Sequence, residues 1–368
     1  MKSAALALTT PAPAIIHRRH RLRPRGWWLV PVLSVALLAV LVAALSIGAM
    51  PIAPAAVVTA LVNAVGIETA WAVSEREALV IAHIRAPRAI MGALAGAALA
   101  IGGVLMQALF RNPLADPALV GVSSGAAVAA ATVTVIGSTF FADLGWSSPF
   151  VLPAAAFVGG WLTVLLTLRL ARTAGHTRIE QVLLAGIAIN ALAGAAIGLL
   201  MLIADDAQLR EVAFWSFGSL GRADWTSIAW LAVALLPALA LYRLVAPWLN
   251  ALLLGEGEAA LLGVPVERIK RGAIIVTCLA VGATVAFTGL IGFVGLVAPH
   301  IVRLLAGPDH RVLLPAAGLL GAVLLPLADL FARTVAAPVE LPIGLVTALL
   351  GAPFFLFLLL RERREVPR

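Results

Sequence analysis

The chain has 368 residues, of which 62% are hydrophobic and only 12% are charged. A soluble domain carries about a quarter charged residues, so this composition excludes an ordinary soluble protein and is typical of a polytopic membrane protein. The formal net charge of +8 does not indicate nucleic-acid binding, because the basic residues stand beside the ends of apolar runs and are not interleaved with aromatic residues. A single cysteine, Cys278, excludes a disulfide framework and a Cys-based metal site.

Residues 1–28 form a polar, basic N-terminal segment that resembles the first part of a signal peptide. Its Arg18–Arg19 pair also resembles a twin-arginine export signal. The apolar run that follows, from 28 to 50, is too long for the core of a signal peptide. We therefore predict an uncleaved first membrane span, with residues 1–28 as a cytoplasmic tail.

After a moderately apolar connection over 51–84, an uncharged run occupies residues 89–110. About 22 residues make roughly 33 Å of helix, which is enough to cross a bilayer core of about 30 Å. Its small residues Gly92, Gly96, Ala100 and Gly103 recur at helical spacing on one face. Small faces let helices approach closely in lipid, so we predict that this helix is the central hub of a bundle.

Further apolar runs continue to the C-terminus and predict about ten membrane helices in total, in an all-α fold. Most of the 26 Lys and Arg residues fall on the side of the N-terminus when the loops are assigned alternately. The positive-inside rule then places both termini in the cytoplasm. We expect one transmembrane domain over 29–361 and a cytoplasmic tail over 362–368. The later spans are expected at 117–136, 149–170, 179–203, 224–246, 270–291, 295–306, 312–332 and 341–360.

The largest cytoplasmic insert is a glycine-punctuated segment at 250–266. We predict that Glu256 opens a short helix within it and that Gly263 and Pro265 close this helix. Such a helix is either a docking knob for a soluble partner or an ordinary connector. The chain's two lysines, Lys2 and Lys270, do not end a GxxxxGK[ST] loop. If the chain takes part in ATP-driven transport, the ATPase must be another polypeptide.

Several motifs that resemble catalytic or metal-binding patterns are better explained structurally. Gly121–Gly125 fits the GxSxG pattern of hydrolases but opens a membrane helix, which favours a small-residue packing patch. Asp205 and Asp206 have no second acidic cluster at helical spacing and are interpreted as loop-end charges. Isolated histidines are more often structural than ligands, so we predict no metal site at His83, His300 or His310.

Three arginines stand out on the outer side, which is otherwise poor in basic residues: Arg85, Arg88 and Arg333. Asp329 lies four residues before Arg333 and can pair with it on one helix face. The arginines either anchor helices at the interface or receive an acidic partner.

Several stretches together resemble the FecCD-type permeases, which are membrane subunits of ABC importers for heme, iron-siderophores and cobalamin. They follow one another from residue 84 to the C-terminus in the family's order. These stretches are IRAPRAIMGALAGAALAIGGVLMQALFRNPLADPALVGVSSGAA, FWSFGSLG, LLGEGEAALLGV, GLIGFVGLVAPHIVRLLAGPDHRVLLP, ADLFAR and ELPIGLVTALLGAPFF.

The resemblance implies a type II ABC importer permease fold and a homodimer in the bacterial inner membrane. Two cytoplasmic ATPase subunits would hold ATP and Mg, and a periplasmic binding protein would deliver the cargo, with no cofactor bound stably to the permease. It implies that Arg85, Arg88 and Arg333 receive acidic residues of the binding protein. The residues implied in ATPase coupling are Leu254, Gly255, Glu256, Gly257, Glu258, Ala259, Ala260 and Gly263. Those implied along the translocation pathway are Asn190, Gly194, Gly198, Met201, Phe214 and Trp215.

Residues 205–221, DDAQLREVAFWSFGSLG, most resemble the heme-import branch, so heme is the expected cargo and a siderophore or cobalamin the alternative. A secondary transporter or channel would need ionisable residues in mid-span, and the predicted spans are nearly bare of them. An intramembrane enzyme would need a convergent polar constellation, which the sequence does not offer.

Overall fold

The computed structural model describes residues 26–64, 66, 73–137, 150–173 and 175–365. Most of the predicted N-terminal tail and the end of the C-terminal tail lie outside these residues, and the domain boundaries stay predictions. The described residues form helices and one two-stranded antiparallel hairpin. In chain order the elements are α1 (Leu29–Ser46), α2 (Pro54–Ala64), α3 (Glu75–Val80), η1 (Ile81–Arg85), α4 (Ala86–Phe110), η2 (Pro117–Val120), α5 (Val122–Thr132), η3 (Val133–Gly137), α7 (Val151–Leu170), β1 (Arg172–Thr173), β2 (His176–Thr177), α8 (Ile179–Ile203), α9 (Asp206–Ser216), α10 (Trp225–Leu252), α11 (Glu256–Leu261), α12 (Val266–Thr288), α13 (Val294–Ala306), α14 (His310–Thr334) and α15 (Ile343–Glu365).

Every predicted span has a helix, which confirms the all-α polytopic fold class. Within the described ranges, seven helices are long and apolar enough to cross a membrane. The remaining spans correspond to shorter apolar helices, namely α5 with η3, α13, and the apolar part of α15. The short span expected at 295–306 is α13, which begins one residue earlier.

The hub helix begins earlier than predicted. α3, η1 and α4 run on as one helical stretch of 36 residues, Glu75–Phe110, in which 78% of the most apolar window is buried. Pro87 does not interrupt it and stands two residues after the π-helical turn η1. The sequence predicted the hub helix only over 89–110; the structure places Pro87 inside the helical stretch as well.

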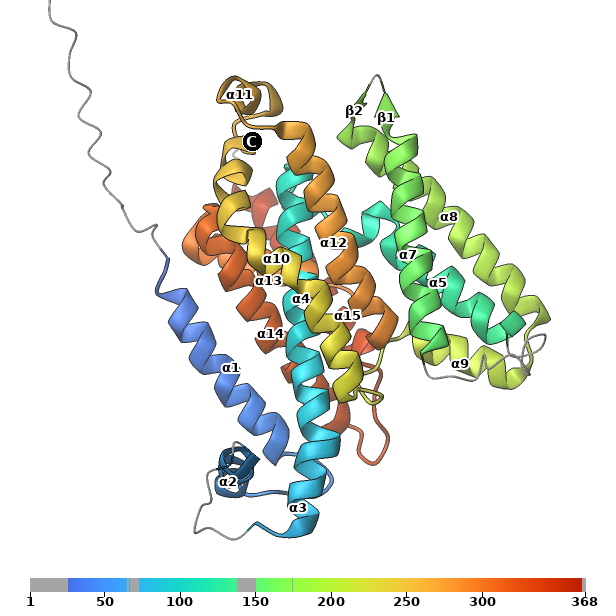
Figure 1. Ribbon diagram of the computed structural model, residues 1–368, viewed down its shortest axis with the longest axis vertical. Helices are drawn as coiled ribbons and strands as arrows, with labels where there is room; N and C mark the ends of the chain where they lie inside the picture. The colour runs from blue at the N-terminus through green and yellow to red at the C-terminus, as the bar shows by residue number, and fades with distance from the viewer. Residues whose placement is uncertain (1–25, 65, 67–72, 138–149, 174, 366–368) are drawn as a thin grey trace, which may run out of the picture.

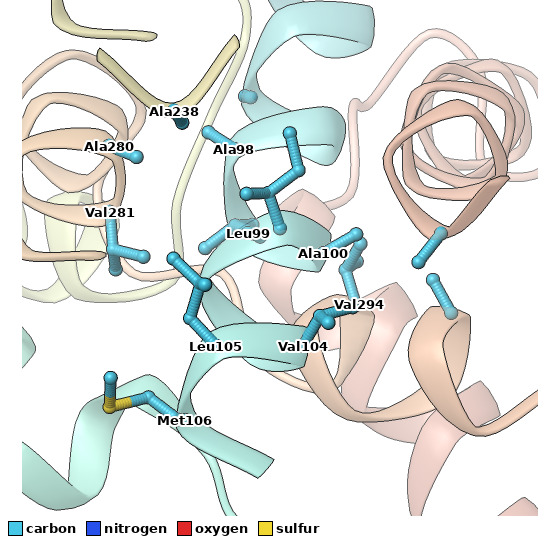
Figure 2. Packing of buried hydrophobic residues seen from close by; sticks show 14 of the residues in the cluster. Ala98, Leu99, Ala100, Val104, Leu105, Met106, Ala238, Ala280, Val281 and Val294 are labelled. Carbon is cyan, nitrogen blue, oxygen red and sulfur yellow. The ribbon is translucent and has the colours of Figure 1, made fainter. Parts of the chain in front are cut away.

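The predicted small face of the hub is where α14 and α13 pack against it. A Cβ added at Gly96 would lie 2.0 Å from the carbonyl oxygen of Gly321 in α14. One added at Gly103 would lie 1.8 Å from the carbonyl oxygen of Gly295 in α13. Figure 2 shows α4 side chains such as Leu99, Val104 and Leu105 filling the space between the neighbouring helices. The hub prediction is confirmed by this packing.

The helices fall into two groups that meet at α12 (Figure 1). The larger group surrounds α4, while α5, α7, α8 and α9 lie together on the other side. Within the second group, a Cβ at Gly125 of α5 would lie 2.5 Å from the carbonyl oxygen of Gly159 in α7. The GxSxG segment is thus a close helix–helix contact, as predicted, and not a catalytic turn.

The two ends of the bundle carry different elements (Figure 1). α11 and the β1–β2 hairpin project at one end, and α2, α3 and α9 lie at the opposite end. The sequence treated 51–84 as a connection and missed α2 and α3. Ser74 marks the start of α3 with a capping box to Glu77, a signal that could have been read from the Ser-x-x-Glu spacing.

Candidate functional site

Arg88 is the centre of an ion-pair cluster at the end of the bundle that carries α2 and α3. It extends from α4 to α14, where its Nη2 lies 2.8 Å from Asp329 Oδ1. Its Nη1 lies 3.0 Å from Glu340. Arg333 Nε lies 3.7 Å from Asp329 Oδ2, which confirms the predicted pair four residues apart. Asp329 therefore joins two arginines from two helices in a nearly buried site.

Arg85 and Arg333 together hold the C-terminal end of α1. Arg85 Nη1 donates to the carbonyl oxygens of Leu45 and Ser46 at 2.6 and 2.9 Å, and its Nη2 donates to that of Met50. Arg333 donates to the carbonyl of Ala44. Helix ends leave carbonyls without helical partners and carry partial negative charge, so two cations are well placed there. These side chains attach α1 to α4 and α14.

The structure thus brings the three predicted docking arginines together, but it turns them inward. Arg85 is 5% exposed, and the side chains of Arg88 and Arg333 are 14% and 9% exposed. Their contact with a binding protein stays a prediction. The half-exposed Glu340 is the partner of Arg88 that an incoming carboxylate could replace.

A cavity of about 630 Å³ lies at the same end of the bundle. Phe214 and Trp215, two of the predicted pathway residues, line it together with Arg88 and Asp329. Asp205, interpreted above as a loop-end charge, caps α9 in front of these aromatics by accepting from the amides of Ala207 and Gln208.

The other predicted pathway residues lie along α8. Asn190 accepts a hydrogen bond from Ser124 at 2.6 Å, so its side chain is turned toward α5. Gly194 and Gly198 have no atom within 4 Å of an added Cβ, and Met201 is exposed. In the structure Asn190 belongs to the contact with α5, whereas Gly194, Gly198 and Met201 lie on an open surface. Whether this surface lines a pathway stays a prediction.

The predicted short helix of the 250–266 segment is α11. Gly255, with φ of +128°, precedes it, and Gly263, with φ of +79°, follows it, both in conformations that favour glycine. Ala259 is buried, while Gly257, Glu258 and Ala260 are exposed. Three leucines around the helix are strongly exposed: Leu254 at 64%, Leu261 at 90% and Leu262 at 65%. The residues predicted for coupling include Leu254 but not Leu261 or Leu262, although the predicted segment 250–266 contains all three.

Glu256, a predicted coupling residue, is turned away from this exposed surface. Its Oε2 lies 2.9 Å from Nζ of Lys270 in α12. Lys270 also donates to the carbonyl of Thr177 in β2 at 2.7 Å. Sequence reasoning treated Lys270 as a basic residue of a cytoplasmic loop and excluded it from a nucleotide site. It missed this link, because nothing in a linear pattern relates residue 177 to residue 270.

Among the described residues, no group of three or more His, Cys, Asp or Glu side chains could hold a metal ion. His310 accepts or donates through Nδ1 to Asn250 at 2.8 Å, and His300 packs edge-on against Phe354 and Phe355. Both contacts suit structural roles.

The bundle of apolar helices with a projecting short helix at one end defines a polytopic membrane permease. The chain belongs to the FecCD transport family, whose model matches residues 36–361, and it is an ABC importer permease of that family. Proteins of this kind are permease subunits and are not themselves enzymes.

Two curated relatives cover most of the chain. It is 46% identical over 299 residues to the hemin transport system permease protein HmuU of Yersinia pestis, over 81% of this chain and 88% of that protein. It is 43% identical over 291 residues to the vitamin B12 import system permease protein BtuC of Salmonella paratyphi A, over 79% and 86%. A solved inward-facing structure of a metal-chelate type ABC transporter is 30% identical, with a TM-score of 0.78 over 91% of this chain and 99% of that one. The type II importer fold is thereby confirmed.

Proposed function

We propose that two copies of this chain form a passive, two-state conduit that imports heme into the cytoplasm. A separate ATPase docks at the end that carries α11, and a periplasmic binding protein docks at the end that carries α2 and α3. The observation that carries the proposal is the exposure of Leu254, Leu261 and Leu262 on and beside the short helix α11, which projects from the bundle. The permease binds no cofactor stably, and ATP and Mg belong to the ATPase.

The exposed surface of α11 has the composition of a protein-binding site. Three leucines on one short segment form an apolar patch, and such patches on soluble-facing surfaces mark interaction sites. Charged residues surround the segment, among them Glu258 and Arg268, so it does not belong to the lipid-facing band. A groove of matching apolar character in an ATPase subunit would cover it.

Replacing Leu261 and Leu262 together by serine should detach the ATPase. Removing two central apolar anchors from an interface weakens binding by roughly a hundredfold. The measurement is co-purification of the tagged permease with its ATPase, followed by titration of the purified subunits. Leu79→Ser, which changes an exposed leucine at the opposite end of the bundle, is the matched control. Undiminished binding by the double variant would contradict the docking role of α11.

Binding-protein docking would use the arginine cluster at the other end. A carboxylate from the binding protein would exchange with Glu340 on Arg88, whose planar guanidinium holds carboxylates in two-point contacts. Arg222 adds a second cation at this end, since its side chain is 80% exposed and its contact with Glu211 is 4.0 Å long.

Dimer formation is proposed along α8. Only 11% of its most apolar window is buried, and the surface at Gly194 and Gly198 is open. A second copy would cover this surface, because small residues let transmembrane helices approach closely. The pathway would then lie at the two-fold axis, with both termini on the cytoplasmic side of the bacterial inner membrane, where the basic loops lie.

Heme is the proposed cargo, and a siderophore or cobalamin is the alternative. The hemin permease relative at 46% identity supports heme, while the vitamin B12 permease at 43% keeps the alternative open. The test is the absorption spectrum of the partner binding protein after incubation with hemin. A strong porphyrin band is expected; its absence, with a cobalamin or ferric-siderophore spectrum instead, would contradict heme.

Ion-coupled transport without an ATPase is the rival mechanism. It needs ionisable groups inside the spans to carry the coupling ion. Among the described residues, the buried charges Arg85, Lys270 and Asp329 are all engaged in the structural contacts given above. This engagement favours a conduit driven by a partner.

A further inference from the structure

The ion pair between Glu256 and Lys270 is the one salt bridge that joins α11 to another helix within the described part of the chain. A six-residue helix is too short to be stable alone, so its position depends on such tertiary contacts. Ala259 supplies a second anchor, since it is buried and its carbonyl accepts from the amide of Val264. A force applied to the exposed leucines of α11 is therefore transmitted to the bundle through these contacts.

Lys270 connects three elements at once. Its Nζ lies 2.9 Å from Glu256 in α11, 3.5 Å from Glu267 in α12 and 2.7 Å from the carbonyl oxygen of Thr177 in β2. The ammonium group donates hydrogen bonds to Glu256 and to the carbonyl of Thr177, and Glu267 adds an ion pair. The residue is only 4% exposed, so the charge could not turn to bulk water if one of these partners moved away.

The β1–β2 hairpin is held by the same turn of α12. The amide and the hydroxyl of Thr177 both donate to Glu267. Arg271 donates to the carbonyl of Gly175 at 3.0 Å and lies 2.9 Å from Glu267. The first turns of α12, the hairpin and, through Lys270, α11 thus form one polar unit. α8 begins at Ile179, two residues after Thr177.

α8 is placed to respond when this unit moves. Leu184, Leu192 and Leu202 are all strongly exposed along it, so one face of α8 is free of neighbours in the single chain, while the opposite face packs against η2 and α5. Toward its far end, a groove of about 520 Å³ lies between it and α5. With one face uncovered, α8 has room to tilt when its first residues move, and it leads directly into α9, whose residues line the outer cavity.

We propose that Lys270 is a positioning residue that transmits movement of α11 to α8 through Thr177. The inference rests on the proposed function, since it assumes that an ATPase moves α11. A second route exists along the chain itself, because α11 leads through residues 262–265 into α12. The two routes differ in one respect: only the first needs the ammonium group of Lys270.

The test uses the full complex of permease, ATPase and binding protein in proteoliposomes, with hemin as cargo. ATP hydrolysis and hemin uptake are measured in the same vesicles. Lys270→Met should retain ATPase binding and hydrolysis, because the leucines of α11 are unchanged. Hemin taken up per ATP hydrolysed should fall about tenfold, within the usual range of energetic coupling between two sites. Lys270→Arg should recover much of the ratio, because it keeps a charge with several donors.

Arg268→Met is the matched control, since it removes a basic side chain from the same turn of α12 at an exposed position, and its ratio should equal that of the wild type. If Lys270→Met fails to fold, Glu256→Gln is the second variant. It removes the charge of the half-exposed partner in the ion pair, and the hemin taken up per ATP hydrolysed should again fall. A wild-type ratio in folded Lys270→Met or in Glu256→Gln would overturn the inference. Absence of ATP-dependent uptake by the wild type would instead refute the proposed function.

Discussion

Gly96→Ala is expected to separate the hub helix from α14 and to be among the most damaging single changes in the chain. The new methyl carbon would lie 2.0 Å from the carbonyl oxygen and 2.6 Å from the carbonyl carbon of Gly321. Backbone atoms cannot turn aside as a flexible side chain would, so the helices must move apart. Overpacking commonly costs about 1–3 kcal/mol, and a clash with backbone belongs at or above the upper end.

The measurement is the melting temperature of the purified protein in detergent, together with the yield of monodisperse material. Gly272→Ala is the matched control, because it lies in the long apolar helix α12 and the new methyl would meet no atom within 4 Å. This control should keep the wild-type melting temperature. A Gly96→Ala protein as stable as the wild type would contradict the close packing of α4 on α14.

Arg85→Glu is expected to release the C-terminal end of α1. The substitution replaces a cation by a carboxylate beside the carbonyl oxygens of Leu45 and Ser46. Hydrogen bonds to a charged group contribute about 1.5–3 kcal/mol each, and the repulsion adds to their loss, so a destabilisation of about 3 kcal/mol or more follows. Limited proteolysis should then cleave the segment between α1 and α3 faster.

Arg76→Met provides the comparison for this variant, since Arg76 is an exposed arginine on α3 at the same end of the bundle. It should leave the melting temperature unchanged. If Arg85→Glu kept both the melting temperature and the proteolysis rate of the wild type, that result would contradict the claim that Arg85 holds the C-terminal end of α1. The melting temperature also bears on the docking role of Arg85. An unfolded variant would lose affinity for the binding protein whether or not Arg85 contacts that protein.

The sequence predicted those features that depend on repeated local patterns. The run of apolar residues at 89–110 and the spacing of Gly92, Gly96 and Gly103 were sufficient to predict a central helix with a close-packed face. The glycines around Glu256 predicted a short helix between two turns, because positive φ angles at such positions favour glycine. The family resemblance rested on motifs spread over most of the chain, and the family match confirms it.

Features that depend on tertiary contacts could not be predicted in the same way. Arg85 sits in the sequence like an exposed interfacial residue, and only the fold reveals that α1 ends directly beside it. Lys270 looked like a basic residue flanking a span, while in the structure it is buried against Thr177, 93 residues away. Leu261 was indistinguishable by pattern from core leucines, because exposure depends on what surrounds a short helix.

The central claim is that the permease supplies a path and a hinge but neither the energy nor the selectivity of import. The most direct test is hemin uptake into proteoliposomes that contain the permease alone, or the permease with its ATPase and loaded binding protein. The full complex should accumulate hemin against a gradient only when ATP is supplied, and the permease alone should accumulate none. Sustained uphill accumulation by the permease alone would contradict the account.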